Sequence, residues 1–217
     1  MIVLFGHQKG GVGKSTIAIN FAYQIQKRYK EICILDLDSQ NSSILFNQLR
    51  QSEKLPIIKC LREKDIDFNS FIKLYASNKN NLLIVDSGGY DSDVNRAALI
   101  KADIIITPVG ISQIEIFGLQ KFRKILKEAS ETIGVKIQTN VLLNNIDSRS
   151  KKKLKELRDY IRDKNTYFNL LESVIHTRAD YKNSYGDGLT VKEYNKKGTA
   201  QEEIKNLSKE IYQLLNN

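Results

Sequence analysis

The stretch GHQKGGVGKST, residues 6–16, joins the apolar run MIVLF to a segment with the periodicity of an amphipathic helix. A glycine-rich turn between a strand and a helix directs free backbone N–H groups, and the positive end of the helix dipole, at whatever occupies the turn. A phosphate chain is the ligand that suits this position best. The stretch therefore predicts a phosphate-binding loop that follows the first strand of a sheet.

The residue types in this loop suit a nucleotide with Mg²⁺. Lys14 can reach the β- and γ-phosphates, and the Ser15 hydroxyl can ligate Mg²⁺. The strict pattern G-x-x-x-x-G-K-[ST] fails at one position, because Gln8 stands where the first glycine is required. The residues expected to bind nucleotide are Gly10, Gly11, Val12, Gly13, Lys14, Ser15 and Thr16.

Outward from the loop, apolar runs such as ICILDL, PIIKC, LLIVD and DIIITPV alternate with amphipathic stretches. Runs rich in Ile, Val and Leu between helices indicate a parallel sheet covered on both faces. We therefore expect a doubly wound, mostly parallel α/β fold, built as one domain over residues 1–217. Helices are expected at residues 14–28, 42–50, 66–76, 93–100, 113–132, 149–164 and 199–215, a short strand at 173–176, and loops at 78–81 and 185–188.

Carboxylates end two of the apolar runs, at the edge where open α/β sheets bind ligands. Asp36 and Asp38 close ILDLD, and their spacing of two residues places both side chains on one face of that strand. Asp86 ends NLLIVD, where it can hold Mg²⁺ through water. For Asp38, capping of the following helix is the alternative role.

The formal net charge of +9 favours polyanionic partners, and residues 149–164 carry eight Lys or Arg against three Asp or Glu. In this segment Leu154, Leu157 and Ile161 repeat at helical spacing and can bury one stripe. Phosphate contacts from the opposite face would give affinity for DNA without sequence choice, and a lysine-rich face that only meets water is the alternative. The DNA-contact candidates here are Lys151, Lys152, Lys153, Lys155, Arg158 and Arg162.

Other features favour a cytoplasmic protein. The first residues lack the pattern of a secretory signal, and no window approaches the roughly 18 apolar residues of a membrane-spanning helix. The two cysteines, Cys33 and Cys60, cannot build a disulfide framework. We expect both thiols to be reduced.

The sequence KGGVGKST resembles the deviant Walker A motif of the ParA/MinD family of ATPases. The resemblance implies ATP and Mg²⁺ as ligands, and a homodimer in which Lys9 reaches the phosphates bound by the partner subunit. ILDLDSQ resembles the family's D-x-D-P-Q motif, with Ser39 in place of proline. By that match Asp38 positions the attacking water, so Lys9, Lys14 and Asp38 are the catalytic candidates. Asp36 would support the metal site formed by Ser15 and Asp86.

Three further assignments depend on the same resemblance. NLLIVD resembles a Walker B strand, although Ser87-Gly88-Gly89 follows where Thr and Pro are common. VLLNNID occupies the place where the family often contacts adenine, which makes Asn144 and Asn145 candidates. Arg178 and Lys182 fall in a region where the family places part of its DNA surface.

The whole chain looks like the small plasmid-type ParA proteins, which implies that no separate N-terminal DNA-binding domain is present. This resemblance implies an ATP-bound dimer that binds DNA nonspecifically, associates with the nucleoid, and partitions plasmid or chromosome with a ParB-like or other centromere-binding adaptor. A MinD-like membrane-associated positioning ATPase is one alternative, but residues 199–215 balance acidic and basic residues, and a helix packed on the domain suits them better. An ATP-dependent biosynthetic ligase on the same fold is the other alternative.

Overall fold

The computed structural model describes residues 1–89, 91–164 and 166–216. Within them, parallel strands form one sheet in the order β3-β2-β4-β1-β5-β6-β7. The strands are β1 Ile2–Phe5, β2 Glu31–Asp36, β3 Lys59–Arg62, β4 Asn81–Asp86, β5 Ile104–Val109, β6 Thr139–Ile146 and β7 Phe168–His176. This confirms the predicted doubly wound α/β architecture.

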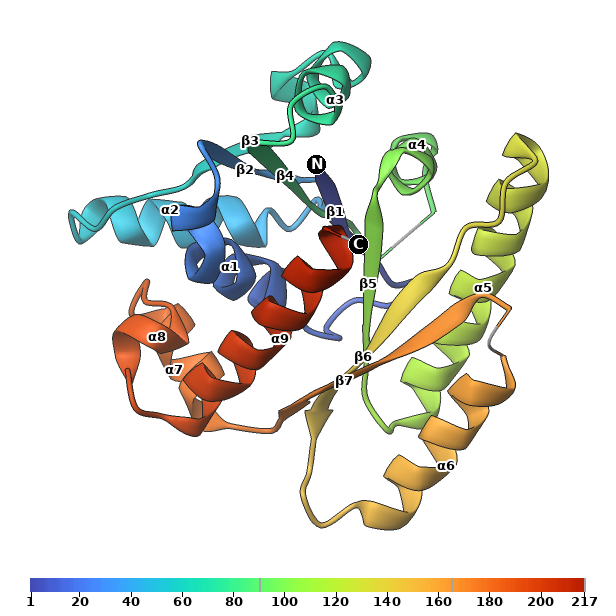
Figure 1. Ribbon diagram of the computed structural model, residues 1–217. Coiled ribbons are helices and arrows are strands. Elements are labelled where there is room, and N and C mark those ends of the chain that lie inside the picture. The colour runs from blue at the N-terminus through green and yellow to red at the C-terminus, as the bar shows by residue number, and fades with distance from the viewer. Residues whose placement is uncertain (90, 165, 217) are drawn as a thin grey trace.

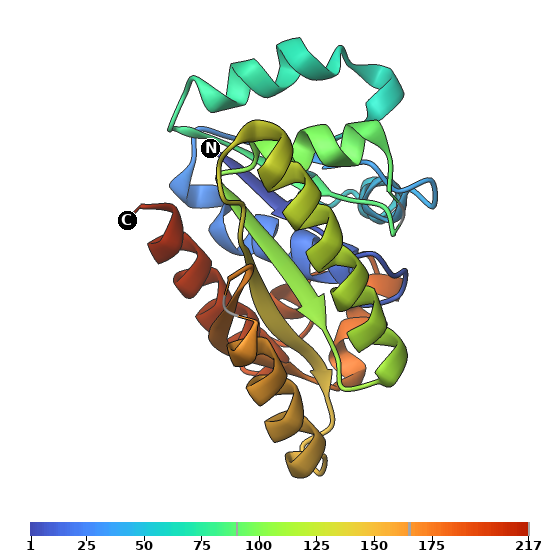
Figure 2. The ribbon, with the colours of Figure 1, turned by 90° about the vertical axis from the view of Figure 1, so that its right-hand side faces the viewer.

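Helices cover both faces of the sheet (Figures 1 and 2). On one face α1, α2, α8 and α9 pack on a core that includes Val3, Phe5 and Ile84, whereas α3 to α6 pack on the other face against Leu4, Val85 and others. Alternate residues of the central strands thus point into two separate cores. The helices are α1 Lys14–Ile25, α2 Ser42–Ser52, α3 Phe68–Ala76, α4 Asp93–Lys101, α5 Gln113–Ile133, α6 Lys151–Asp163, α7 Ala179–Gly186, α8 Val191–Tyr194 and α9 Thr199–Leu215.

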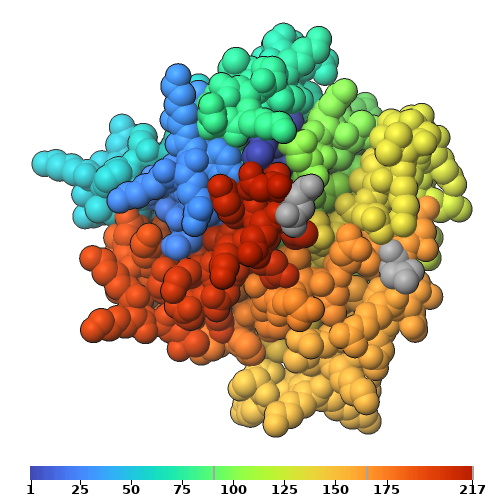
Figure 3. Space-filling view, viewed as in Figure 1, coloured from blue at the N-terminus to red at the C-terminus, as the bar shows by residue number. Residues whose placement is uncertain are grey.

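The C-terminal helix α9 has the bounds expected from the sequence and packs on the domain. Its stripe of Ala200, Ile204, Leu207 and Ile211 is 0 to 1% exposed. In Figure 3 the helix runs across the middle of the face. The apolar stripe of α9 is therefore used within the fold.

Three elements differ from the expectation. The first helix ends at Ile25 and continues as a 3₁₀ turn, Gln26–Arg28. Strand β3 begins only at Lys59, since the Pro56 carbonyl accepts hydrogen bonds from the side chains of Arg50 and Tyr23 instead of joining the sheet. The segment expected to end in a loop at residues 185–188 forms α7, whose single buried residue gave no helical periodicity to detect.

Strand β7 is longer than the predicted strand at 173–176. Its pairing with β6 shifts register between Val141 and Leu143, which leaves the N–H groups of Glu172 and Ser173 outside the ladder. Both donate to the Glu210 carboxylate of α9, at 2.8 and 3.0 Å. A side chain from a distant helix thus satisfies this irregular part of the strand.

Candidate functional site

The glycine loop leaves the sheet at the carboxyl end of its central strand. The Gly6 N–H donates to the Ile106 carbonyl at 2.9 Å and fixes the start of the loop. The register pairs Asp86 with Phe5 on one side and with Asp36 on the other. The loop and two of the predicted carboxylates are therefore neighbours at one edge of the sheet.

Two glycines give the loop its conformation. Gly11 and Gly13 have φ values of 79° and 93°, in a left-handed region that other residues rarely adopt. Among the described residues, no side chain caps the start of α1. The N–H groups of the first turn are thus available to an anion.

The Asn144 side chain supports the loop from the direction of the sheet. Its Nδ2 donates to the Val12 carbonyl at 2.7 Å, and a Cβ at Gly13 would collide with the same nitrogen. The side chain of its neighbour, Asn145, accepts from Thr177 Oγ1 at 2.9 Å. The Asn144 amide is thus already used by the loop, while adenine contact for both asparagines stays a prediction.

The Lys14 side chain lies inside the loop and is 5% exposed. Its Nζ donates to the Lys9 carbonyl at 3.2 Å. Burial lowers the pKa of Lys14, whereas the carboxylates of Asp86 and Asp38 raise it. The ammonium is held where a phosphate would supply the opposite charge.

Asp36 and Asp38 have different surroundings. Asp36 is buried, and its carboxylate accepts from the N–H groups of Ser43 at 2.9 Å and Ile44 at 3.3 Å, which caps α2. Asp38 is half-buried, accepts from the Gln40 N–H at 3.0 Å and lines a cavity. The alternative role of Asp38 as a helix cap is therefore wrong, because Asp36 provides that cap.

Asp86 is fully buried beside two hydroxyl groups. Ser43 Oγ donates to its Oδ2 at 2.8 Å, and the Ser15 hydroxyl is also close enough to lower the carboxyl pKa. Burial first, and then repulsion from Asp36, raise the pKa of Asp86 to about 7. Its Oδ1 finds no hydrogen-bond partner among the described residues.

These residues fit a Mg²⁺ ion that is held mainly by water and phosphate. Over the described ranges, no group of three or more His, Cys, Asp or Glu could bind a metal by itself. Mg²⁺ usually keeps several waters and binds through one or two protein oxygens with substrate phosphates. The Ser15 hydroxyl and the unpaired Oδ1 of Asp86 supply oxygens of that kind.

A cavity of about 820 Å³ lies over the loop. Its size and mixed lining are typical of a site for a small organic ligand. The structure brings Arg178 and Lys182 into its wall, together with Tyr181, instead of grouping them with the basic residues of α6. The lining residues are Gly10 to Ile17, Asp38, Gln40, Ser42, Glu115, Asn144, Asn145, Ile175 to Ala179, Tyr181, Lys182 and Tyr185.

The basic helix α6 forms as predicted and protrudes from the domain (Figures 1 and 3). Leu157 and Ile161 are buried, and Leu154 is half-buried. Arg158 is half-buried, so the lysines and Arg162 form most of the basic surface. The exposed basic residues of α6 are Lys151, Lys152, Lys153, Lys155 and Arg162.

The segment after Asp86 lies directly on the loop. A Cβ at Gly89 would stand 2.8 Å from the backbone nitrogen of Gly10 and 3.0 Å from the carbonyl carbon of Lys9. Real Cβ atoms are essentially never this close to backbone atoms. Glycine at position 89 therefore permits a close approach of this segment to the loop.

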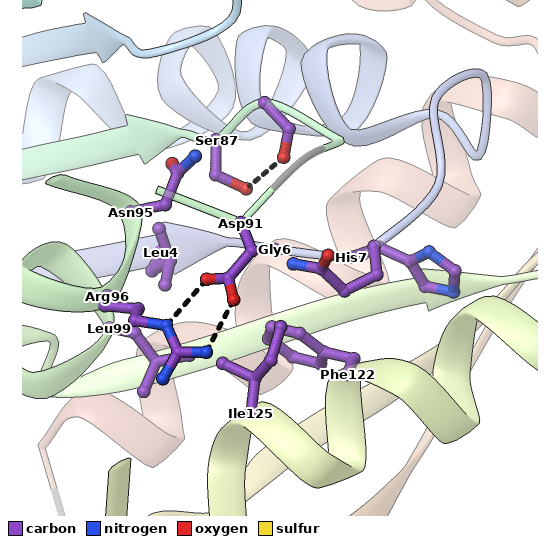
Figure 4. Close-up of a pocket in the computed structure, with 12 residues that line it drawn as sticks. Leu4, Gly6, His7, Ser87, Asp91, Asn95, Arg96, Leu99, Phe122 and Ile125 are labelled. Carbon is purple, nitrogen blue, oxygen red and sulfur yellow. Dashed lines mark hydrogen bonds and ion pairs between the residues drawn. The ribbon is translucent and has the colours of Figure 1, made fainter. Parts of the chain in front are cut away.

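A small cavity of about 20 Å³ lies next to this segment (Figure 4). Arg96 Nε donates to the Asp91 carboxylate at 2.8 Å (Figure 4). Arg96 Nη2 also donates to Glu128 of α5 at 2.9 Å. His7 borders the cavity, and burial together with the positive charge of Lys14 lowers its pKa to about 3. The space suits one water molecule rather than a substrate.

A family model described as the CobQ/CobB/MinD/ParA nucleotide binding domain matches residues 3–191. The chain belongs to this family. Membership confirms the resemblance seen in KGGVGKST. No curated protein sequence matches the chain at a significant level.

Solved structures of MinD and ParA proteins share the fold of this MinD/ParA family member. MinD from Aquifex aeolicus is 17% identical, with a TM-score of 0.75 over 98% of this chain and 97% of that one. A McdA variant from Cyanothece in complex with ATP is 12% identical, with a TM-score of 0.73 over 97% and 96%. A putative plasmid partition protein from Borrelia burgdorferi bound to AMPPNP is 16% identical, with a TM-score of 0.64 over 99% and 98%. At these identities the likeness shows the fold alone.

Sequence reasoning missed parts of this MinD/ParA-type site. His7 stands inside the loop motif, but nothing local indicates that it is buried. The Gly88-Gly89 pair was a visible signal for a close approach, although its partner could not be read from sequence. No membrane-spanning helix is found in the part of the chain that the structure describes.

Proposed function

We propose that this MinD/ParA family member is a Mg²⁺-dependent ATPase that dimerises on ATP, binds DNA nonspecifically and partitions DNA with a ParB-like or other centromere-binding adaptor. The observation that carries the ATPase part is the convergence of the glycine loop, Lys14 and Asp38 on one cavity of about 820 Å³. In this proposal the protein acts in the cytoplasm, on the nucleoid.

The loop residues bind the phosphates first. The N–H groups that begin α1 and the Lys14 ammonium face the β- and γ-phosphates. Ser15 and Asp86 hold Mg²⁺, which when bound offsets the negative charge of the phosphate oxygens. Asp36 supports this site by holding Ser43, whose hydroxyl orients the Asp86 carboxylate.

Hydrolysis then requires two more residues. Asp38 orients the attacking water, and its half-buried carboxylate already borders the cavity. Lys9 of the second subunit offsets the charge that develops on the transferred phosphoryl group, as an arginine finger does. Hydrolysis in this proposal therefore depends on dimerisation.

The surface of α6 supports the DNA part of the proposal. Its exposed lysines protrude from the domain while Leu157 and Ile161 fix the helix. The stripe of α9 that a MinD-like membrane helix would need is buried in the core, which favours DNA over a membrane as the surface bound. Arg178 and Lys182 line the cavity, so the proposed DNA contacts concentrate on α6.

The test is binding to a random-sequence DNA duplex with Mg²⁺ and either ATP or ADP, over a range of salt. We expect tight, salt-sensitive binding with ATP only. Replacing Lys152 and Lys155 by alanine should lower the slope of log K against log salt by about 2, since each phosphate contact contributes roughly 0.9. A separate test concerns the role of Lys9 across the dimer: the variant Lys9→Ala should bind ATP but hydrolyse it slowly.

The matched control replaces Lys121 and Lys124 by alanine, two exposed lysines on α5. It removes the same charge from another helix and should keep the wild-type salt slope. Equal, weak DNA binding with ATP and ADP would refute the DNA part of the proposal. A normal hydrolysis rate in Lys9→Ala would refute the role of Lys9 across the dimer.

A further inference from the structure

The Glu203 side chain of α9 connects residues of the cavity wall. Its Oε1 accepts from His176 Nδ1 at 2.9 Å and from Arg178 Nη2 at 2.7 Å. Tyr181 OH donates to Oε2 at 3.2 Å. The Glu203 side chain is only 11% exposed, so one carboxylate beneath the surface holds three side chains.

All three partners of Glu203 line the large cavity, although Glu203 does not. Next to them, Thr177 bonds to Asn145, which borders the cavity after β6. The glycine loop provides the other part of the lining and is the expected phosphate site. The wall that contains His176, Arg178 and Tyr181 is therefore left for the base and sugar of a nucleotide.

The same helix offers an internal comparison. Glu210 lies seven residues after Glu203 and also bonds to β7, through the N–H groups of Glu172 and Ser173. Neither of those two residues lines the cavity. Glu210 thus connects α9 to the middle of β7, whereas Glu203 connects α9 to residues at the end of β7 that line the cavity.

We infer that Glu203 is a positioning residue for the base and sugar end of the nucleotide site. It fixes the direction of the Arg178 guanidinium and the His176 ring, two groups whose rotamers would otherwise have to be ordered by the ligand. The C-terminal helix is thereby coupled to nucleotide affinity. This inference rests on the proposed function, because it assumes that the cavity binds ATP.

The test compares ATP with inorganic tripolyphosphate, which offers the phosphates without base or sugar. Both are titrated calorimetrically with Mg²⁺ into the full chain, the variant Glu203→Gln and the control Glu210→Gln. We expect Glu203→Gln to weaken ATP binding about tenfold, equivalent to about 1.4 kcal/mol, and to leave tripolyphosphate binding within about twofold. KM for ATP should rise while kcat is unchanged.

Glu210→Gln should bind both ligands as the wild type does, although it removes one hydrogen bond between the same two elements. Equal weakening of ATP and tripolyphosphate binding in Glu203→Gln would overturn the inference, because it indicates a general structural defect. Unchanged ATP binding in that variant would also overturn it. If the wild-type chain binds no ATP, the proposed function itself fails, and that result is distinct from both.

Discussion

Breaking the ion pair between the buried Arg50 guanidinium and the partly exposed Glu193 carboxylate should lower stability clearly, and Glu193→Gln tests this. The Arg50 side chain is 1% exposed and bonds to both Glu193 oxygens, at 2.8 and 2.9 Å. It also donates to the carbonyls of Pro56 and Gly188 and stacks over the Tyr23 ring. The pair therefore ties α2 to the segment that carries α8.

The magnitude follows from what each substitution leaves behind. Breaking a fully buried pair by removing one partner costs about 3 to 5 kcal/mol. The Glu193 side chain is 35% exposed, so water partly compensates, and we expect Glu193→Gln to lower the free energy of unfolding by about 2 to 3 kcal/mol. Arg50→Met should cost a similar amount, because the buried Gly188 carbonyl loses the Arg50 donor and the Glu193 carboxylate loses its cation.

The assay is urea denaturation of both single variants and of the double variant. If the pair acts as described, the double variant should lose about 1 to 2 kcal/mol less than the sum of the single losses. A loss below about 0.5 kcal/mol in Glu193→Gln would place the pair among ordinary surface ion pairs. Additive losses would refute the direct coupling.

Two further predictions concern the loop. Gly89→Ala should slow ATP hydrolysis with little change in ADP binding, because its Cβ would press on the Gly10 nitrogen, and Gly186→Ala, whose Cβ meets open space, is the control for rate measurements. His7 has a folded pKa of about 3 against 6.5 for the free side chain, so stability is highest above pH 6.5 and falls as the pH drops toward 3. Denaturation of wild type and His7→Gln at pH 7.5 and pH 5 should show about 2 kcal/mol of extra loss in the wild type, and parallel losses would contradict a buried neutral imidazole.

The sequence predicted those parts of the fold that depend on local pattern. Apolar runs gave the strands because both faces of a parallel sheet are buried, and residues 199–215 gave α9 through a clear apolar stripe. The sequence did not predict α7, because Ser184 is its only buried residue and the helix has no apolar face. Tertiary contacts hold it in place.

The candidate site divides in the same way. The sequence predicts Lys14, Asp38 and Asp86, because each of them lies within or directly beside a local motif: a glycine loop or the end of an apolar strand. The hydrogen bond from Asn144 to Val12 joins residues that are 132 positions apart, and Glu203 reaches Arg178 over 25 positions. Such contacts are set by how the helices pack, and no local pattern encodes them.

The central place of β1 has a consequence for how the chain folds during synthesis. Ile2 pairs with Leu83 and Val3 pairs with Ile104, so β1 is synthesised some 80 to 100 residues before the strands that flank it. Such distant pairing slows folding and leaves apolar strands exposed in partial chains. In a nascent chain the glycine loop should therefore reach its folded conformation late. A fragment that ends before β4 should aggregate rather than fold.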